Sequence, residues 1–255
     1  WKTKKLSVNE DFWKNPNPIN SYYSGFAGAD ACITRGTGFK LCIQKSDEEW
    51  LKNFSDTVNF SGKISTSHDK RGNSVMANLF ITSKSWVKDL ERNFSVVAQK
   101  TYRLAPPNLI DKHLQICWLI GILDGDGCVG LQNQYRDNKQ IFSISIGSSS
   151  MAILEYIKKL TNELVPQSMG LINSAPRQIT ASFKANCNRY AITGFRGILL
   201  FELLKDINVP KMNRKWKNPK ILEYISNFKQ KRPKLFNNLP DYISQNPPKS
   251  VIGAD

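Results

Sequence analysis

The chain has 255 residues, and its 36 lysines and arginines outnumber its 21 aspartates and glutamates to give a formal net charge of +15. This balance favours a polyanionic partner, and a hydrophobic content of 40% is enough for a packed core, which argues against intrinsic disorder. No apolar run approaches the ~20 residues that span a bilayer, and the first residues lack the apolar stretch of a signal peptide, so we expect an intracellular protein without a membrane partner. Five cysteines without CxxC spacing and only two histidines argue against both a zinc site and a disulfide framework.

The predicted elements fall into two units that repeat one order of helices and strands. In the first unit a helix begins at about Ser21, strands follow at 31–34 and 39–44, a helix opens at Ser46, strands follow at 63–67 and 74–81, and a helix opens at Ser83. In the second unit a helix at 110–123 precedes strands at 129–136 and 140–147, a helix at 151–160, strands at 171–174 and 178–184, and a helix around 197–204. We therefore expect an α+β fold of two αββαββα halves, with an N-terminal half at 1–104, a linker at 105–113, a C-terminal half at 114–230 and a basic, proline-containing tail at 231–255.

Two short segments, one in each unit, follow nearly the same pattern. They are Tyr23–Ala31 (YSGFAGADA) and Leu119–Gly127 (LIGILDGDG), and each opens a similar unit. Small residues stand four apart on one helical face in both segments: Gly25 and Ala29 in the first, Gly121 and Gly125 in the second. Two such helices can touch backbone to backbone, so we expect the halves to pack through them.

Each of the two helices ends near an aspartate, Asp30 in the first and Asp126 in the second. Close packing of the helices would bring these carboxylates side by side, where they repel each other unless a cation lies between them. Carboxylate, carbonyl and water oxygens suit a hard divalent ion such as Mg²⁺. Either segment alone predicts only a core helix that ends in a solvated aspartate, whereas the pair favours a cation site.

Both segments resemble the signature helix of the LAGLIDADG homing endonucleases, and two copies in one chain resemble the monomeric, pseudo-twofold members of that family. The resemblance covers nearly all of residues 20–225. It implies two halves with saddle-like antiparallel sheets, and a sequence-specific double-strand DNA endonuclease of the intron- or intein-homing type. It also implies Mg²⁺ as cofactor, with Mn²⁺ or Ca²⁺ able to replace it for binding, and a monomer acting on a long DNA site.

Two alternative functions stay open on the same scaffold. The family includes RNA maturases that help a host intron to splice, and net charge does not separate DNA from RNA as the partner. A transcriptional regulator without cleavage is the other alternative. Family members are frequent in organelle introns, so the resemblance makes a mitochondrion or chloroplast a candidate compartment.

By resemblance, Asp30 and Asp126 are the catalytic, metal-binding carboxylates, and the main-chain carbonyls of Ala29 and Gly125 are further metal ligands. The family also places one basic residue in each half near the reacting phosphate. Lys100 fits the first position and Lys215 the second, with Lys211 as the next candidate. For each lysine the alternative is a surface charge that steers phosphates.

The two segments differ at two positions that bear on the site. Gly28 stands where the second segment has Asp124, a supporting position, and Ala31 stands where it has Gly127. An alanine after a helix costs about 1 kcal/mol if the backbone there is left-handed. Neither change removes a catalytic carboxylate, so we expect activity to be retained.

Strand alternation predicts which side chains face DNA. Polar residues without acids share one parity on the predicted strands, which suits base contacts in a major groove, although a solvated sheet face is the plainer alternative. The candidates are Arg35, Lys40, Gln44 and Arg71 in the first half, and Gln132, Gln134, Arg136, Ser143, Gln178, Thr180, Ser182 and Lys184 in the second.

Overall fold

The computed structural model describes residues 6–34, 36–69, 74–133, 139–165, 170–180 and 183–236, without the side chains of residues 174–186. The predicted positions Arg35, Arg71, Gln134, Arg136 and Ser182 lie outside the described residues. No helix in the described part of the chain combines the length and the apolar character needed to cross a membrane.

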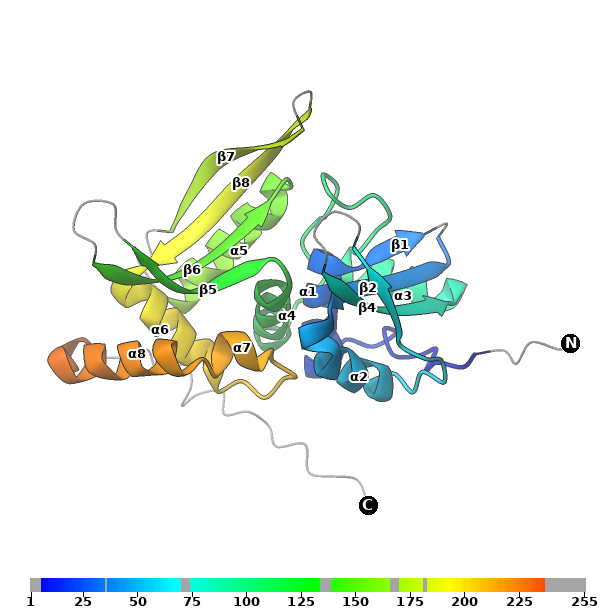
Figure 1. The fold of residues 1–255 in the computed structure, drawn as a ribbon, viewed down its shortest axis with the longest axis horizontal. Coiled ribbons are helices and arrows are strands. Elements are labelled where there is room, and N and C mark those ends of the chain that lie inside the picture. Colours follow the sequence, from blue (N-terminus) through cyan, green and yellow to red (C-terminus); the bar gives the residue numbers. More distant parts are fainter. Residues whose placement is uncertain are drawn as a thin grey trace, which may run out of the picture.

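Two halves with the same order of elements make up the fold (Figure 1). The first half comprises α1 (Pro18–Asp30), β1 (Cys32–Thr34), β2 (Gly38–Gln44), α2 (Glu48–Thr57), β3 (Ser65–His68), β4 (Val75–Thr82) and α3 (Lys84–Phe94). The second comprises α4 (Lys112–Gly125), β5 (Gly127–Asn133), β6 (Gln140–Ser148), α5 (Met151–Leu164), β7 (Leu171–Thr180), β8 (Phe183–Thr193) and α6 (Gly194–Lys205), followed by α7 (Asn213–Trp216) and α8 (Pro219–Lys231). The predicted α+β class and αββαββα order are thus confirmed.

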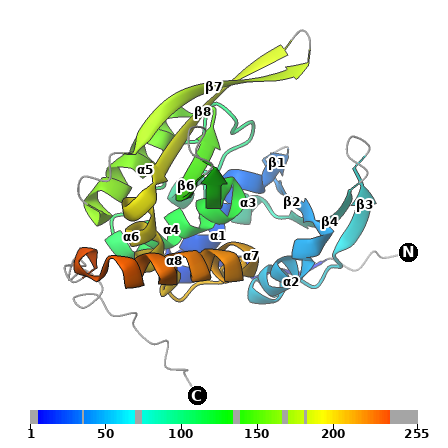
Figure 2. The same ribbon diagram turned by 60° about the vertical axis from the view of Figure 1, so that its left-hand side comes forward.

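Each half contains a four-stranded antiparallel sheet. The strand orders are β1-β2-β4-β3 and β5-β6-β8-β7, so the two sheets have equivalent topologies. Helices α1 and α4 pack against each other in the centre of the molecule, between the two sheets (Figures 1 and 2). This arrangement places the ends of both signature helices at the junction of the halves.

The first sheet has one buried face and one open face. Phe39, Leu41 and Ile43 of β2 are buried, whereas Lys40 and Gln44 between and beyond them are exposed. Strand alternation explains this pattern, because successive side chains point to opposite faces of a sheet. The open face is therefore the side on which a partner could lie.

Capping residues fix where the two central helices begin. Asn17 accepts hydrogen bonds from the N–H groups of Ile19 and Asn20, and Pro18 occupies the first helical position of α1. Asp111 caps α4 in the same way. Each cap satisfies main-chain donors that a helix leaves free at its first turn.

The last predicted hairpin is placed differently in the structure. The predicted strand at 178–184 is wrong as a single element, because β7 continues to Thr180 and β8 begins at Phe183, with Gln178 paired to Lys184 across the two strands. Pro176 lies within β7, where the sequence suggests a break. Since β7 is the edge strand of its sheet, a proline there costs no hydrogen bond to a further strand.

Candidate active site

Helices α1 and α4 approach each other at backbone contact. A Cβ at Gly25 would lie 2.1 Å from the carbonyl oxygen of Trp118, and a Cβ at Gly121 would lie 1.9 Å from that of Tyr22. Real Cβ atoms do not approach other atoms so closely, so only glycine fits at either position. The packing predicted from the small residues is therefore present.

Asp30 and Asp126 converge at the end of this helix pair. Asp30 is the last residue of α1 and Asp126 follows α4 directly. The Oδ2 atom of Asp30 lies 3.3 Å from the position that a Cβ on Gly125 would take, next to Asp126 in the chain. Both side chains are exposed, so a ligand can reach them from solvent.

The surroundings of the two aspartates disfavour their ionised forms. Although Asp30 is exposed, the nearby protein displaces much of the water around its carboxylate, and this desolvation together with the charge of Asp126 raises the pKa of Asp30 to about 6. Desolvation also raises the pKa of Asp126, against the opposing effect of Lys100 and Lys215. Two mutually repelling carboxylates of this kind gain stability from a bound cation.

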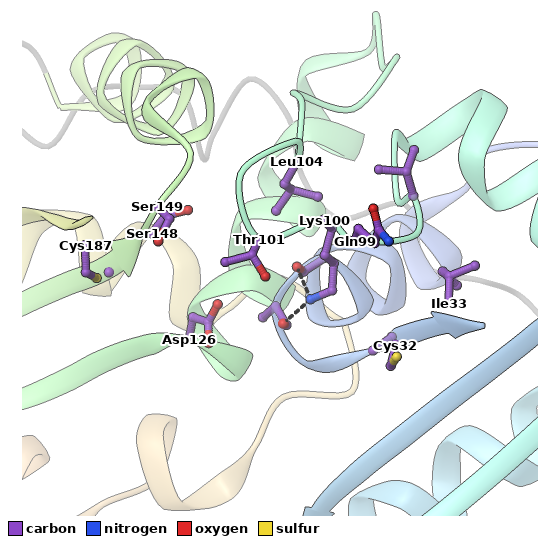
Figure 3. Close-up of a pocket in the computed structure, with 15 residues that line it drawn as sticks. Cys32, Ile33, Gln99, Lys100, Thr101, Leu104, Asp126, Ser148, Ser149 and Cys187 are labelled. Carbon is purple, nitrogen blue, oxygen red and sulfur yellow. Dashed lines mark hydrogen bonds between the residues drawn. The ribbon is translucent and has the colours of Figure 1, made fainter. Parts of the chain in front are cut away.

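Each half supplies a lysine to the end of its own signature helix. The Nζ atom of Lys100 donates to the carbonyl of Gly28 at 2.7 Å and to that of Ala29 (Figure 3). The Nζ atom of Lys215 donates to four carbonyls, those of Leu123 (2.7 Å), Asp124 (2.6 Å), Gly125 (3.3 Å) and Gly127 (2.7 Å). A cation at a helix C-terminus satisfies free carbonyls and complements the helix dipole.

The two lysines differ in their environment. Lys215 is 5% exposed and desolvation lowers its pKa to about 8, whereas Lys100 is half-buried and desolvation lowers its pKa against the pull of Asp126 and Asp30. The other candidate, Lys211, donates instead to the carbonyls of Lys205 and Ile207. Of the two candidates in the second half, only Lys215 lies at the end of α4.

The carbonyls of Ala29 and Gly125, expected as metal ligands, accept hydrogen bonds from the lysines. A carbonyl oxygen has two lone pairs, so this contact does not by itself prevent a second interaction. Within the described residues no group of three or more His, Cys, Asp or Glu side chains is placed to hold a metal. At the end of the helix pair, Asp30 and Asp126 are side chains that could supply oxygen ligands to a divalent cation, with water or substrate oxygens needed to complete its shell.

Asp124 anchors the segment that carries Lys215. It is fully buried and accepts hydrogen bonds from the Tyr22 hydroxyl (2.8 Å), the Met212 N–H (3.0 Å) and the Trp216 indole (2.6 Å). Tyr22 comes from α1, so the aspartate also links the two halves. The sequence predicts only a general supporting role for Asp124, because its hydrogen-bond partners lie far away in the chain.

The equivalent position in the first half is filled differently. A Cβ at Gly28 would be 3.7 Å from the nearest side-chain carbon of Leu104, an ordinary packing distance. Ala31 has φ −75° and ψ 150°, so its backbone is extended and the expected cost of a left-handed alanine does not arise. The two departures from the second segment are therefore compatible with the fold.

A cleft of about 410 Å³ opens beside Lys100, between the two halves. The second half lines the cleft with Asp126, Ser148, Ser149 and Cys187 (Figure 3). The residues that line it from the first half include Lys100, Thr101, Gln99, Cys32 and Ile33. The cleft thus combines the carboxylate of Asp126 with the lysine of the other half. Hydroxyl groups and an ammonium group suit a phosphate.

The predicted base-contacting residues are distributed unevenly in the structure. Lys40 and Gln44 are exposed on the open face of the first sheet, and Gln132 on β5 is half-buried. Ser143 is 1% exposed, and its hydroxyl has no hydrogen-bond partner among the described residues, contrary to its expected exposure. The side chains of Gln178, Thr180 and Lys184 lie outside the description.

Arg189 is not among the residues predicted from the sequence, because residues 185–193 are not predicted to form a strand. In the structure Arg189 is exposed on β8, and its Nη2 atom donates to the Ser145 hydroxyl at 2.8 Å. A clearer turn signal between the two strands could have shown the alternation of residues 183–193.

Solved structures with a similar fold were found by structural comparison. One is I-SmaMI bound to an uncleaved DNA target in the presence of calcium ions, with 16% sequence identity and a TM-score of 0.50, covering 88% of this chain and 97% of that one. Another is the LAGLIDADG homing endonuclease I-GzeII in complex with its DNA target, with 13% identity and a TM-score of 0.50, covering 91% of this chain and 97% of that one. No protein-family model and no curated protein matches the sequence. The chain therefore has the fold of the LAGLIDADG homing endonucleases, as its two signature segments predict.

Proposed function

We propose that the chain is a sequence-specific, divalent-cation-dependent endonuclease that cuts both strands of DNA as a monomer. The observation that carries this proposal is the convergence of Asp30 and Asp126 at the ends of two helices in backbone contact. The DNA bound in the similar I-SmaMI and I-GzeII structures, and the calcium ions in the first, support the substrate and the kind of cofactor.

The residues of the site have different proposed roles in hydrolysis. Asp30 and Asp126 would hold a divalent cation, which would supply Lewis-acid chemistry for phosphodiester hydrolysis. Lys100 lines the cleft opposite Asp126, where its ammonium group can bind a phosphate oxygen. Lys215 and Asp124 fix the end of α4 and thereby the position of Asp126.

The charge of the protein fits this substrate. The open face of the first sheet carries Lys40 and Gln44, and the chain as a whole carries a net charge of +15, which attracts the phosphate backbone of DNA. Polar side chains on an open sheet face can read base edges once the backbone is bound.

The test is cleavage of a randomised duplex library by the purified chain in Mg²⁺. We expect specific double-strand breaks, abolished by Asp30→Asn or Asp126→Asn with duplex binding largely retained. Asp11→Asn is a matched control, because Asp11 is an exposed acid whose partner is the surface residue Lys14, outside the site.

Three results would contradict the proposal. A folded wild type that makes no specific cut would exclude the nuclease, and equal behaviour of the wild type and the two aspartate variants would favour a binding protein such as a regulator. Tighter binding of a structured intron RNA than of duplex DNA at matched salt would favour the maturase alternative.

A further inference from the structure

The internal symmetry of the chain relates positions on the two sheets. Cys32 and Cys128 each stand two residues after the catalytic aspartate of their half. Cys32 pairs with Lys40 on β2, and Cys128 pairs with Ser145 on β6. Lys40 and Ser145 therefore occupy equivalent positions, and so do the residues two places beyond them.

Two polar residues occupy equivalent positions on the next strands. Cys42 stands two places after Lys40, and it pairs with Asn78 on β4. Gly147 stands two places after Ser145, and it pairs with Arg189 on β8. Residues paired directly across antiparallel strands point to the same face of the sheet. Asn78 and Arg189 thus stand at matching places on the open faces of the two halves.

Arg189 is held in place but left without an acidic partner. Its Nη2 atom donates to the hydroxyl of Ser145, a residue that is 2% exposed. This buried hydrogen bond orients the guanidinium group from the side of the sheet. No carboxylate forms an ion pair with Arg189 in the described part of the chain, whereas Arg92 and Arg214 pair with aspartates. The remaining N–H groups of the guanidinium make no hydrogen bond to any other side chain that the structure describes, so they can bind a ligand that approaches the open face.

Asn78 is oriented by a serine in a comparable way. Its Nδ2 atom donates to the Ser67 hydroxyl on β3 at 2.9 Å and has a longer contact of 3.4 Å with the carbonyl of Met76. The side chain is partly exposed, and within the described residues its Oδ1 atom accepts no hydrogen bond. The amide can therefore present its Oδ1 acceptor directly, and a donor once the long 3.4 Å hydrogen bond to Met76 is exchanged for one to a partner.

The position of Arg189 lies close to the proposed catalytic centre. Gly147, its partner across β6 and β8, lines the cleft together with Asp126, and so does Cys187, two residues before Arg189. A base read by Arg189 must consequently lie near the cleavage position, and Asn78 would read a base at the matching place in the other half-site.

We infer that Arg189 reads a guanine and Asn78 reads an adenine at pseudo-equivalent positions of the DNA site, an inference that rests on the proposed function. An arginine fork matches the O6 and N7 acceptors of guanine, and an asparagine amide matches N6–H and N7 of adenine in the major groove. The two half-sites therefore differ at this place, although the two halves of the protein share one fold.

The experiment measures base preference by selecting bound duplexes from a library in Ca²⁺, the ion present with uncleaved DNA in the I-SmaMI complex. Arg189→Ala should lose about 5-fold to 150-fold of the preference for guanine at one position, and Asn78→Ala should lose the preference for adenine at the position related to it through the centre of the site. Arg189→Asn should shift the first preference towards adenine.

Two further variants separate a base contact from other roles. Ser145→Ala should weaken the guanine preference partly and at the same position only, because the serine positions Arg189 without touching the base. Arg92→Ala is the matched control, since Arg92 lies on α3 in an ion pair with Asp89, and it should leave the profile unchanged. Thermal unfolding of every variant checks that the fold is retained.

The outcomes distinguish this inference from the proposed function. A uniform loss of affinity in Arg189→Ala would identify a phosphate contact and overturn the inference, as would an unchanged profile with specific cutting intact. A wild type that binds no duplex sequence-specifically would overturn both the inference and the proposed function.

Discussion

The backbone contact between α1 and α4 makes the substitution Gly25→Ala a sharp test of the fold and the site together. The added Cβ would lie 2.1 Å from the carbonyl oxygen of Trp118 and 2.8 Å from the amide nitrogen of Ile122. Both are main-chain atoms of α4, so no side-chain rotation can relieve the contact. To reach an ordinary separation of 3.4 Å, the helices must move apart locally by about 1.3 Å (3.4 − 2.1).

The size of the effect follows from two opposing terms. Overpacking a close-packed contact costs about 3 kcal/mol when the neighbour is rigid, and replacing glycine by alanine within a helix returns up to about 1 kcal/mol. We therefore expect a net loss of about 2 kcal/mol in the free energy of unfolding, or a decrease in Tm of about 4–8 °C. If the proposed function is right, a displacement of about 1 Å at Asp30 and Asp126 should also lower the cleavage rate about 100-fold.

Gly28→Ala is the matched control on the same helix. Its Cβ would meet only side-chain carbons of Leu104, at 3.7 and 3.8 Å, so the helical preference of alanine should raise the unfolding free energy by about 0.5–1 kcal/mol. Thermal and denaturant unfolding, with cleavage assays on the same samples, measure both variants. Equal Tm values for Gly25→Ala and Gly28→Ala would refute the backbone contact on which the active-site geometry depends.

Four further substitutions probe the charged groups. The pKa of Asp30 is raised to about 6 in the folded protein, so the wild type should lose stability as the pH rises from about 4 through 6. At pH 8 without divalent ions, Asp30→Asn should therefore unfold at a higher temperature than the wild type. Mg²⁺ should raise the Tm of the wild type but not that of Asp30→Asn; an equal rise in both would argue against cation binding at this carboxylate. Lys215→Met should lower the free energy of unfolding by about 2–4 kcal/mol in a denaturant titration. Lys100→Met should lower it clearly less, because two carbonyls lose their donor instead of four. A larger loss in Lys100→Met would contradict the role of Lys215 in fixing the end of α4. Asp124→Asn should destabilise the protein by about 1–3 kcal/mol. The NH₂ group of the new amide would face at least one of the three donors that Asp124 binds, namely the Tyr22 hydroxyl, the Met212 N–H and the Trp216 indole. An unchanged unfolding midpoint would show that this buried network is replaceable.

The central helix pair could be predicted from the sequence because its determinants are local. Glycines spaced four apart define a helix face that tolerates backbone contact, and the position of each aspartate at the end of its segment follows from the same register. The structure bears this out at Gly25 and Gly121. Strand alternation on β2 was equally readable, since Lys40 and Gln44 interrupt an apolar series that is buried.

Other features depend on contacts between distant parts of the chain. The Nζ atom of Lys215 binds carbonyls about ninety residues away, and no pattern around residue 215 records which carbonyls a fold leaves free there. Ser143 is buried although its sequence neighbours suggest an open face, because the strands on either side of β6 decide its exposure. The hairpin of β7 and β8 lacks a glycine, asparagine or proline at its turn, so its strands could not be separated by local signals.

The charges at the junction of the halves explain why lysines and a cation can both belong to this site. Two ionised carboxylates and two helix C-termini of about half a charge each bring roughly three negative charges together, and Lys100 and Lys215 compensate about two of them. Desolvation, together with the charge of Asp126, raises the pKa of Asp30. The residual negative charge would repel a phosphate. One bound divalent cation would change the local net charge from about −1 to about +1. The proposed metal would therefore allow a DNA phosphate to enter the cleft beside Asp126, in addition to activating that phosphate for hydrolysis. Binding of the cation and binding of DNA at the cleavage position should consequently be coupled, with each raising the affinity for the other.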